Sequence, residues 1–257
     1  MGIPLELKRT KLDRLRPLLR SAPINETEQC LDFLSPEVRE KFSIVETSNV
    51  SAHGYDPYAQ AIINENLDGL ILDCGAGSRG DYLANVVNYE IVDYPSTDVR
   101  GVAESLPFRD AVFDGVLCLN VLEHVKDPFC AAREIARVMK PGARLYCVVP
   151  FLQPLHAYPH HYYNMTAEGL RNLFADYLVA DRQEIPASGL PVWTLSWFLG
   201  SWLNGLPTEK RDQFLNMRVA ELIGDPLRHL DADFVKFLSM EKNFELASTT
   251  ALFAHKA

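Results

Sequence analysis

From residue 69 onward the sequence alternates short apolar runs with stretches of helical character, and this alternation limits the folds that the chain can adopt. Short apolar runs of this kind are typical of parallel strands that are joined by helical crossovers. The sequence predicts seven strands, at residues 69–72, 90–92, 98–100, 115–119, 144–149, 178–180 and 249–254. We therefore predict an α/β fold with a Rossmann-like, doubly wound and mostly parallel seven-stranded sheet.

Helical segments are expected at both ends of this pattern. Residues 1–66 look mixed and helical and would form an N-terminal arm or lid, while residues 67–257 would form the main domain. Residues 187–245 would be a helical cap, inserted before the last strand. A chain of 257 residues with 47% hydrophobic content can bury a substantial core, so one large domain with these appendages is expected.

The charge of the chain is unevenly distributed. The net charge of −9 argues against nucleic acid as the main partner, because neutralising phosphates usually requires a basic face. Residues 5–20, in contrast, carry six basic residues against two acidic ones, interleaved with leucines. This segment predicts an amphipathic helix that packs on the domain or on a second subunit, with contact to a membrane surface as the alternative.

Residues 185–208 contain no charged side chain, although three tryptophans lie within them. Prolines and polar residues interrupt the segment, which makes it a poor transmembrane helix. It predicts an apolar cap over the substrate or a homodimer surface, with an interfacial membrane helix as the alternative. The start of the chain has no apolar stretch of the kind found in secretion signals, and the five cysteines lack zinc-type spacing, so we expect a cytoplasmic protein with reduced thiols.

A glycine-rich turn follows the first predicted strand. The strand ends at Asp73, and Gly75, Gly77 and Gly80 come next. Glycine tolerates the dihedral angles of a tight turn and lets the backbone approach a ligand, so the turn predicts a nucleoside site. Asp93, expected at the end of the second strand, could accept hydrogen bonds from both ribose hydroxyls. The same glycine spacing with Asp93 also fits a nicotinamide dinucleotide, which is the alternative.

Four further motifs follow the turn in order. They are Ala103-Glu104-Ser105-Leu106-Pro107-Phe108, Phe113-Asp114-Gly115-Val116, Asn120-Val121-Leu122-Glu123-His124-Val125 and Val138-Met139-Lys140-Pro141-Gly142. With the turn, this stretch of about eighty residues resembles the class I S-adenosylmethionine (SAM)-dependent methyltransferases, in particular the small-domain "type 11"-like group. The resemblance implies SAM as the cofactor, and a nicotinamide site does not explain the Leu-Pro-Phe and Leu-Glu-His segments.

The resemblance also implies which residues hold each part of the cofactor. Asp73 and the backbone of Gly75 and Gly77 would hold the methionine part, and Asp93 the ribose. Asn120 would lie beside the methionine part or the reacting methyl group.

Ala103 and Glu104 would border the adenine. Members of the family often carry an aspartate just before this pair, where it reads the adenine amino group, but this chain has Val102 there. The adenine contact is therefore expected from the backbone or from Glu104.

The loop after the fifth predicted strand is rich in histidine and tyrosine, and loops beyond the strand carboxyl ends of such sheets face the ligand. Because the histidine side chain in general can exchange a proton near neutral pH, His156, His160 and His161 of this loop could deprotonate a hydroxyl, as could His124 by its position after the fourth strand. The alternative is that these histidines pack the loop. No carboxylate is spaced nearby, so no metal ion is expected.

These observations predict a SAM-dependent methyltransferase that methylates a hydroxyl of a small molecule, a glycan or a specialised metabolite. Aromatic loop residues would suit a sugar, whereas the tryptophan-rich cap would suit a lipid-linked or polyketide-like acceptor. A SAM-fold protein that binds without turnover and a nicotinamide-dependent oxidoreductase are the alternative functions.

Overall fold

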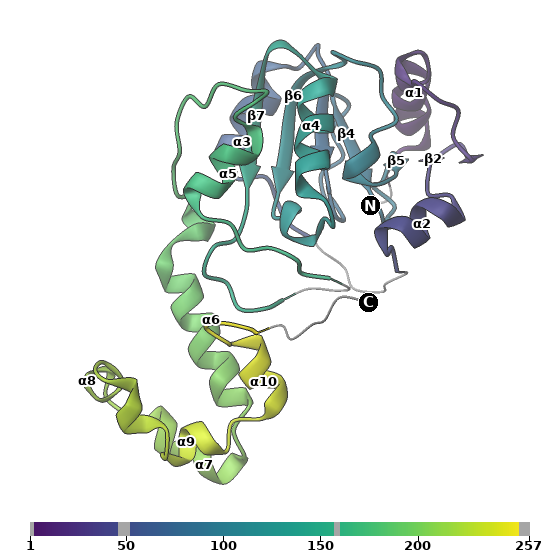
Figure 1. Ribbon diagram of the computed structural model, residues 1–257. Helices are drawn as coiled ribbons and strands as arrows, with labels where there is room; N and C mark the ends of the chain where they lie inside the picture. The colour runs from purple at the N-terminus through teal and green to yellow at the C-terminus, as the bar shows by residue number, and fades with distance from the viewer. Residues whose placement is uncertain (1–2, 46–51, 157–159, 252–257) are drawn as a thin grey trace, which may run out of the picture. The chain divides into compact units, whose positions relative to one another are not determined.

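A computed structural model describes residues 3–45, 52–156 and 160–251 of the chain (Figure 1). The chain divides into two compact units. The first comprises residues 1–151 and 157–183, and the second comprises residues 152–156 and 184–257.

The first unit contains a seven-stranded sheet with the order β1-β2-β5-β4-β3-β6-β7. Every neighbouring pair is parallel except β1 and β2, which are antiparallel. The strands are β1 (Asn25–Glu26), β2 (Leu31–Asp32), β3 (Ile71–Cys74), β4 (Val86–Glu90), β5 (Val99–Arg100), β6 (Phe113–Leu119) and β7 (Met139–Val148). The predicted α/β class with a mostly parallel, seven-stranded, Rossmann-like sheet is confirmed.

The predicted strand at 178–180 is wrong, and the one at 249–254 is not found in its described part, because residues 25–32 form the edge of the sheet instead. Residues 178–180 and 249–251 form no strand, and residues 252–254 lie outside the described residues. The two strands that were not predicted are β1 and β2. Leu31 of β2 pairs with Val99 of β5. A strand of two residues is too short to show an apolar run in the sequence, so pairing decides the conformation: β2 pairs with β5, and β1 pairs with β2.

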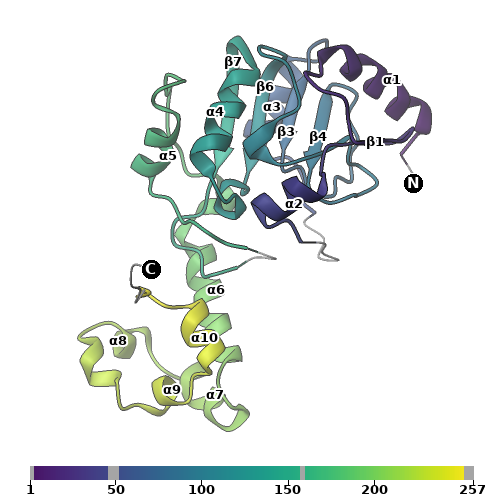
Figure 2. The ribbon, with the colours of Figure 1, turned by 45° about the vertical axis from the view of Figure 1, so that its right-hand side comes forward.

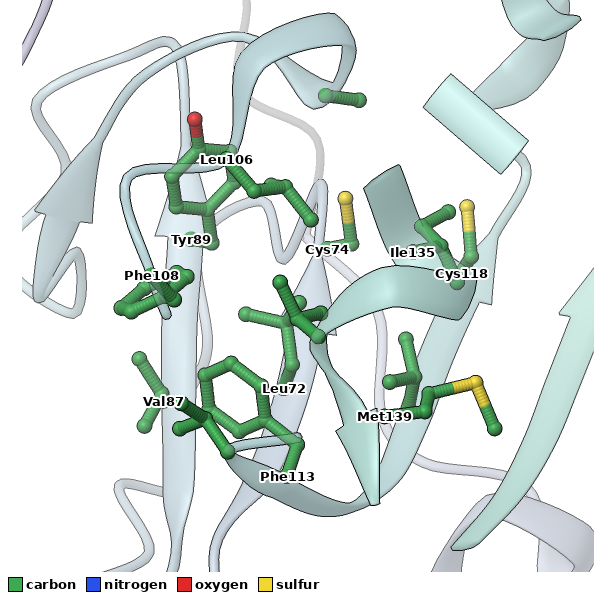
Figure 3. Packing of buried hydrophobic residues seen from close by; sticks show 14 of the residues in the cluster. Leu72, Cys74, Val87, Tyr89, Leu106, Phe108, Phe113, Cys118, Ile135 and Met139 are labelled. Atoms are coloured by element: carbon green, nitrogen blue, oxygen red, sulfur yellow. The ribbon is translucent and has the colours of Figure 1, made fainter. Parts of the chain in front are cut away.

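Helices cover both faces of the sheet, and successive strand residues alternate between the two faces. Leu72 and Val87 pack in a cluster with α1 (Leu5–Leu15), α4 (Pro128–Val138) and α5 (Ala167–Phe174), part of which is drawn in Figure 3. Ile71 and Val86 pack on the other face with α3 (Pro57–Glu65). This arrangement is doubly wound, as expected.

The starts of α3 and α4 follow directly from the sequence. In both helices a proline occupies the first position and the preceding aspartate caps the helix: Asp56 accepts from the Ala59 amide, and Asp127 accepts from the Cys130 amide. Proline lacks the N–H that would be unsatisfied there, and the carboxylate satisfies one of the others. Short 3₁₀ turns complete the unit at Arg16–Leu18, Ala103–Ser105 and Leu122–His124.

The basic N-terminal helix α1 packs on the first unit (Figure 2). Its Lys11 Nζ, which is buried, donates to the Val86 carbonyl oxygen at 2.6 Å and to Asp98 at 3.0 Å. Lys8 is buried too, and its Nζ donates to the Thr97 carbonyl oxygen at 2.7 Å. Two of the basic residues therefore contact β4 and the residues just before β5 rather than face solvent. Residues 1–66 supply strands β1 and β2 as well as α1, α2 (Pro36–Phe42) and α3; their role as a lid stays a prediction.

The second unit is helical, as predicted for residues 187–245. It contains a 3₁₀ turn at Ala187–Gly189, α6 (Pro191–Asn204), α7 (Thr208–Leu215), α8 (Val219–Leu222), a 3₁₀ turn at Pro226–His229, α9 (Asp233–Lys236) and α10 (Met240–Glu245). Trp202 stacks on Phe214 with ring centroids 6.0 Å apart, and its indole N–H donates to the Phe234 carbonyl oxygen. No strand follows these helices up to residue 251, so the expected insertion before a last strand is wrong for the described residues.

Among the described residues, no helix combines the length and the apolar character that are needed to cross a bilayer. The first half of α6 nevertheless leaves Val192, Trp193, Leu195 and Trp197 exposed.

Candidate functional site

The candidate site lies at the carboxyl ends of β3, β4 and β6 in the first unit, where the glycine turn begins. Gly75 and Gly77 have φ angles of 77° and 64°, a region that glycine adopts without strain. A side chain at Gly75 would also place its Cβ 2.4 Å from Val121 Cγ2. The Gly75 and Ala76 amides donate to the Tyr89 carbonyl oxygen, which fixes the turn against β4. The sequence-predicted turn is therefore tight and closely packed.

Asp73, the last residue but one of β3, is fully buried and ion-paired. Its Oδ2 accepts from Arg79 Nε at 2.9 Å and from the Tyr55 hydroxyl at 2.8 Å, and Arg79 Nη2 lies 2.8 Å away. Burial raises the pKa of Asp73, while Arg79 and Tyr55 oppose that rise by stabilising the carboxylate. Its other oxygen, Oδ1, has no hydrogen-bond partner among the described residues. A buried acceptor of this kind calls for a donor from an ordered water or from a ligand.

The carboxylate at the end of β4 is that of Glu90, which the sequence analysis did not select. Its Oε2 accepts from the Gly77 amide at 2.8 Å, and its Oε1 accepts from the Ile91 amide at 2.7 Å. Burial raises the pKa of Glu90, and these backbone N–H groups oppose the rise.

The expectation that Asp93 ends this strand is wrong, because β4 stops at Glu90 and Asp93 is exposed in the following loop. The apolar pair Ile91-Val92 suggested a strand there. In the folded chain the Ile91 and Val92 amides instead turn back to the Glu90 carboxylate. The preceding Val86-Val87 pair was the signal that could have placed the strand, and Glu90 at its end, correctly.

Ala103 and Glu104 form the short 3₁₀ turn after β5, and both are buried. The Tyr89 hydroxyl donates to the Val102 carbonyl oxygen at 2.9 Å, which holds this segment beside β4. Glu104 Oε1 accepts from the Asp127 amide, so its carboxylate is directed to the start of α4. An adenine contact in this segment would therefore come from backbone rather than from the Glu104 side chain.

Asn120 lies directly after β6 with φ of 55°. Its amide still donates to the Val148 carbonyl oxygen at 2.9 Å, and the residue is exposed. Asparagine tolerates this left-handed conformation better than most residues, and such outliers gather at functional sites. The structure thus places Asn120 at the same sheet edge as the glycine turn.

Three of the four predicted histidines belong to the first unit. His124 Nδ1 lies 2.7 Å from the His160 carbonyl oxygen, and the His124 and His161 rings are 5.7 Å apart. His160 Nε2 lies 3.1 Å from the Ser43 carbonyl oxygen, and His161 Nε2 lies 2.8 Å from Asn164 Oδ1. A carbonyl oxygen only accepts, so Nδ1 of His124 and Nε2 of His160 carry the proton in the neutral rings.

His156 belongs to the second unit, where its Nδ1 lies 3.0 Å from the Pro154 carbonyl oxygen and its ring 5.2 Å from Trp197. The predicted histidine-rich loop is therefore divided between the two units.

The carboxyl group of Glu123, which was not predicted as a site residue, lies beside His124. Glu123 is fully buried, and its Oε1 lies 3.7 Å from His124 Nε2. Burial raises the pKa of Glu123 to about 8. The Leu-Glu-His segment was noted in the sequence, but nothing there shows that the glutamate side chain turns inward.

Residues 72–147 match a protein-family model described as a methyltransferase domain. Among curated relatives, the chain is 38% identical over 71 residues to the ubiquinone biosynthesis O-methyltransferase of Dechloromonas aromatica, covering 28% of this chain and 27% of that protein. It is 43% identical over 60 residues to the uncharacterized protein YafE of Escherichia coli, covering 23% of this chain and 28% of that protein. The chain thus spans only about a quarter of the length of these relatives.

A solved structure, the YcgJ protein from Bacillus subtilis, matches with a TM-score of 0.40 and 20% identity, covering 60% of this chain and 86% of that chain. At this TM-score the likeness adds nothing to the match of the family model. That match covers the turn, Glu90, the Ala103-Glu104 pair and the Leu-Glu-His segment. Residues 72–147 are therefore identified as a methyltransferase domain, as the order of the motifs predicted.

Proposed function

We propose that this protein is a SAM-dependent methyltransferase that methylates a hydroxyl oxygen of a small-molecule or glycan acceptor. The observation that carries the proposal is Asp73 Oδ1, which is buried without a hydrogen-bond donor among the described residues and lies beside a turn with two left-handed glycines. The name of the Dechloromonas relative, an O-methyltransferase, supports an oxygen acceptor.

The residues at the turn fit the charges of SAM. Asp73 and Glu90 supply two carboxylates and Arg79 supplies one guanidinium. When all three side chains are ionised, their net charge is −1. SAM carries a sulfonium, an ammonium and a carboxylate, and hence one net positive charge. Opposite charges attract strongly where burial excludes water. In this proposal Asp73 Oδ1 accepts from the ammonium, and Glu90, in place of Asp93, accepts from the ribose hydroxyls.

When bound, SAM supplies a methyl group that is already activated by its positive sulfur, so that the protein mainly has to align the acceptor oxygen. A hydroxyl must also lose its proton. Among the predicted bases we favour His124, because its Nδ1 proton is held by the His160 carbonyl oxygen, which leaves Nε2 as the basic nitrogen. The charge that develops on the ring lies beside Glu123, whose ionisation a neighbouring cation favours.

Calorimetric titration with S-adenosylhomocysteine (SAH), the product of methyl transfer, tests the cofactor. We expect binding of SAH and none of the nicotinamide dinucleotides; the opposite pattern would overturn the proposal. Transfer from SAM with a labelled methyl group, to fractionated polar and lipid extracts, then identifies the acceptor. Binding of SAH without transfer to any fraction would favour a protein that binds SAM without turnover.

A further inference from the structure

Arg79 lies inside the glycine turn, although an arginine there has no role in the motifs described above. Its side chain is only 4% exposed, and its amide donates to Ser96 Oγ. Nε and Nη2 contact Asp73 Oδ2, while Nη1 donates to the His53 carbonyl oxygen at 2.6 Å. The guanidinium lies 4.3 Å from the centre of the Tyr55 ring. The group is therefore held in one orientation before any ligand arrives.

The Asp73–Arg79 pair leaves opposite polar groups available side by side. Both contacts from Arg79 fall on Oδ2, so Oδ1 stays without a donor in the described part of the chain. Of the five N–H groups that a guanidinium offers, the printed contacts of Arg79 occupy three, counted over the described residues. One ion pair thus presents a carboxylate acceptor and guanidinium donors together.

This combination suits a zwitterionic α-amino acid group. Its ammonium can donate to Asp73 Oδ1 while its carboxylate accepts from Arg79, so that positive and negative charges alternate and every buried charge has a partner. A pyrophosphate would instead bring two negative charges next to Asp73 and Glu90. We infer that Arg79 binds the α-carboxylate of the methionine part of SAM and thereby selects against analogues that lack this group.

The inference rests on the proposed function, since it assigns a residue within the same cofactor site. Its competitor is a purely structural role, in which Arg79 only ties the turn to the segment around His53 that leads into α3. The two roles differ in their dependence on the ligand. A carboxylate-binding arginine matters only for ligands that carry the carboxylate, whereas a structural arginine matters equally for all of them.

The experiment compares three ligands with three proteins by calorimetry. The ligands are SAH, its decarboxylated analogue, and 5′-methylthioadenosine, which lacks the whole amino acid part. The proteins are the wild type, Arg79→Met and Arg79→Lys; the lysine keeps a charge for Asp73 but loses the planar fork of donors. Arg171→Met, on the exposed face of α5, is the matched control.

We expect both Arg79 variants to bind SAH about 10- to 100-fold more weakly and 5′-methylthioadenosine within about twofold of the wild type, as befits loss of a charged hydrogen bond. The preference of the wild type for SAH over its decarboxylated analogue should nearly vanish in Arg79→Met. Equal losses for all three ligands, or unchanged SAH affinity, would overturn the inference. Absence of SAH binding by the wild type would instead overturn the proposed function itself. The affinities of the three ligands are compared within each protein. A partial loss of stability would affect all three affinities alike, so it does not change this comparison.

Discussion

The cofactor side and the acceptor side of the candidate site are built differently. On the cofactor side, Asp73, Arg79 and Glu90 are held by several hydrogen bonds each, in a turn that packs tightly against Val121. On the acceptor side, His124 and His160 each point a ring nitrogen at a backbone carbonyl oxygen, and the His124 side chain is 34% exposed. In the proposed enzyme, charged side chains with fixed partners would bind the cofactor, whereas the proposed base would stay in partial contact with solvent.

The sharpest test of the acceptor side is His124→Ala. Loss of the base should lower kcat for methyl transfer by about 100- to 1000-fold, because a positioned general base contributes on this scale. SAH affinity measured by calorimetry should stay within about twofold, since the ring is not part of the cofactor turn. His161→Ala is the matched control and should lower kcat by a smaller factor. Equal loss in both variants would show that the loop, and not the His124 ring, limits the rate.

The cofactor side is tested by Glu90→Ala against Asp93→Ala. The first should weaken SAH binding by about 100-fold, because it removes a half-buried carboxylate that would accept from the ribose hydroxyls and that also orients the Gly77 amide. The second should change the affinity by less than about twofold, because Asp93 is exposed beyond the strand end. Calorimetric titration of both variants decides between the two carboxylates, and a reversed order would return the ribose contact to Asp93.

The rigidity of the cofactor turn is tested by Gly75→Ala. At φ of 77°, with the new Cβ 2.4 Å from a β-branched side chain, the free energy of unfolding should fall by about 2–3 kcal/mol. Gly80→Ala is the control within the same turn, because its Cβ meets nothing within 4 Å. Chemical unfolding of the two variants should separate them clearly, and similar stabilities would mean that the turn is less tightly packed than its geometry indicates.

The smallest effect concerns Glu123, the buried carboxyl on the acceptor side. Its pKa is raised to about 8 from an ordinary value of 4.5, so the folded state retains a proton that the unfolded state has lost. Its contribution to stability is thus fully present below about pH 4.5 and is lost as the pH rises through 8. Relative to Glu123→Gln, the wild type should lose about 1 kcal/mol of unfolding free energy between pH 7 and pH 8. A constant difference across this range, measured by urea unfolding, would contradict the raised pKa.

Much of the first unit could be predicted because its signals are local. A parallel strand that is buried on both faces needs a continuous apolar run, and a helix that follows Asp56-Pro57 or Asp127-Pro128 is announced by its own cap. The glycines of the turn are likewise required by local geometry, at Gly75 and Gly77 through positive φ.

The sequence alone was enough to predict the α/β class, the glycine turn and the methyltransferase domain of residues 72–147, since each depends on residues that are close together in the chain. Only the tertiary structure decided that the edge strands are β1 and β2, that Lys8 and Lys11 are buried, and that Glu90 rather than Asp93 ends β4. It alone joined Arg79 to Asp73, Tyr55 and His53. The physical reason is that the environment of a charged side chain is set by partners distant in sequence, and these partners determine whether it faces solvent or a buried site.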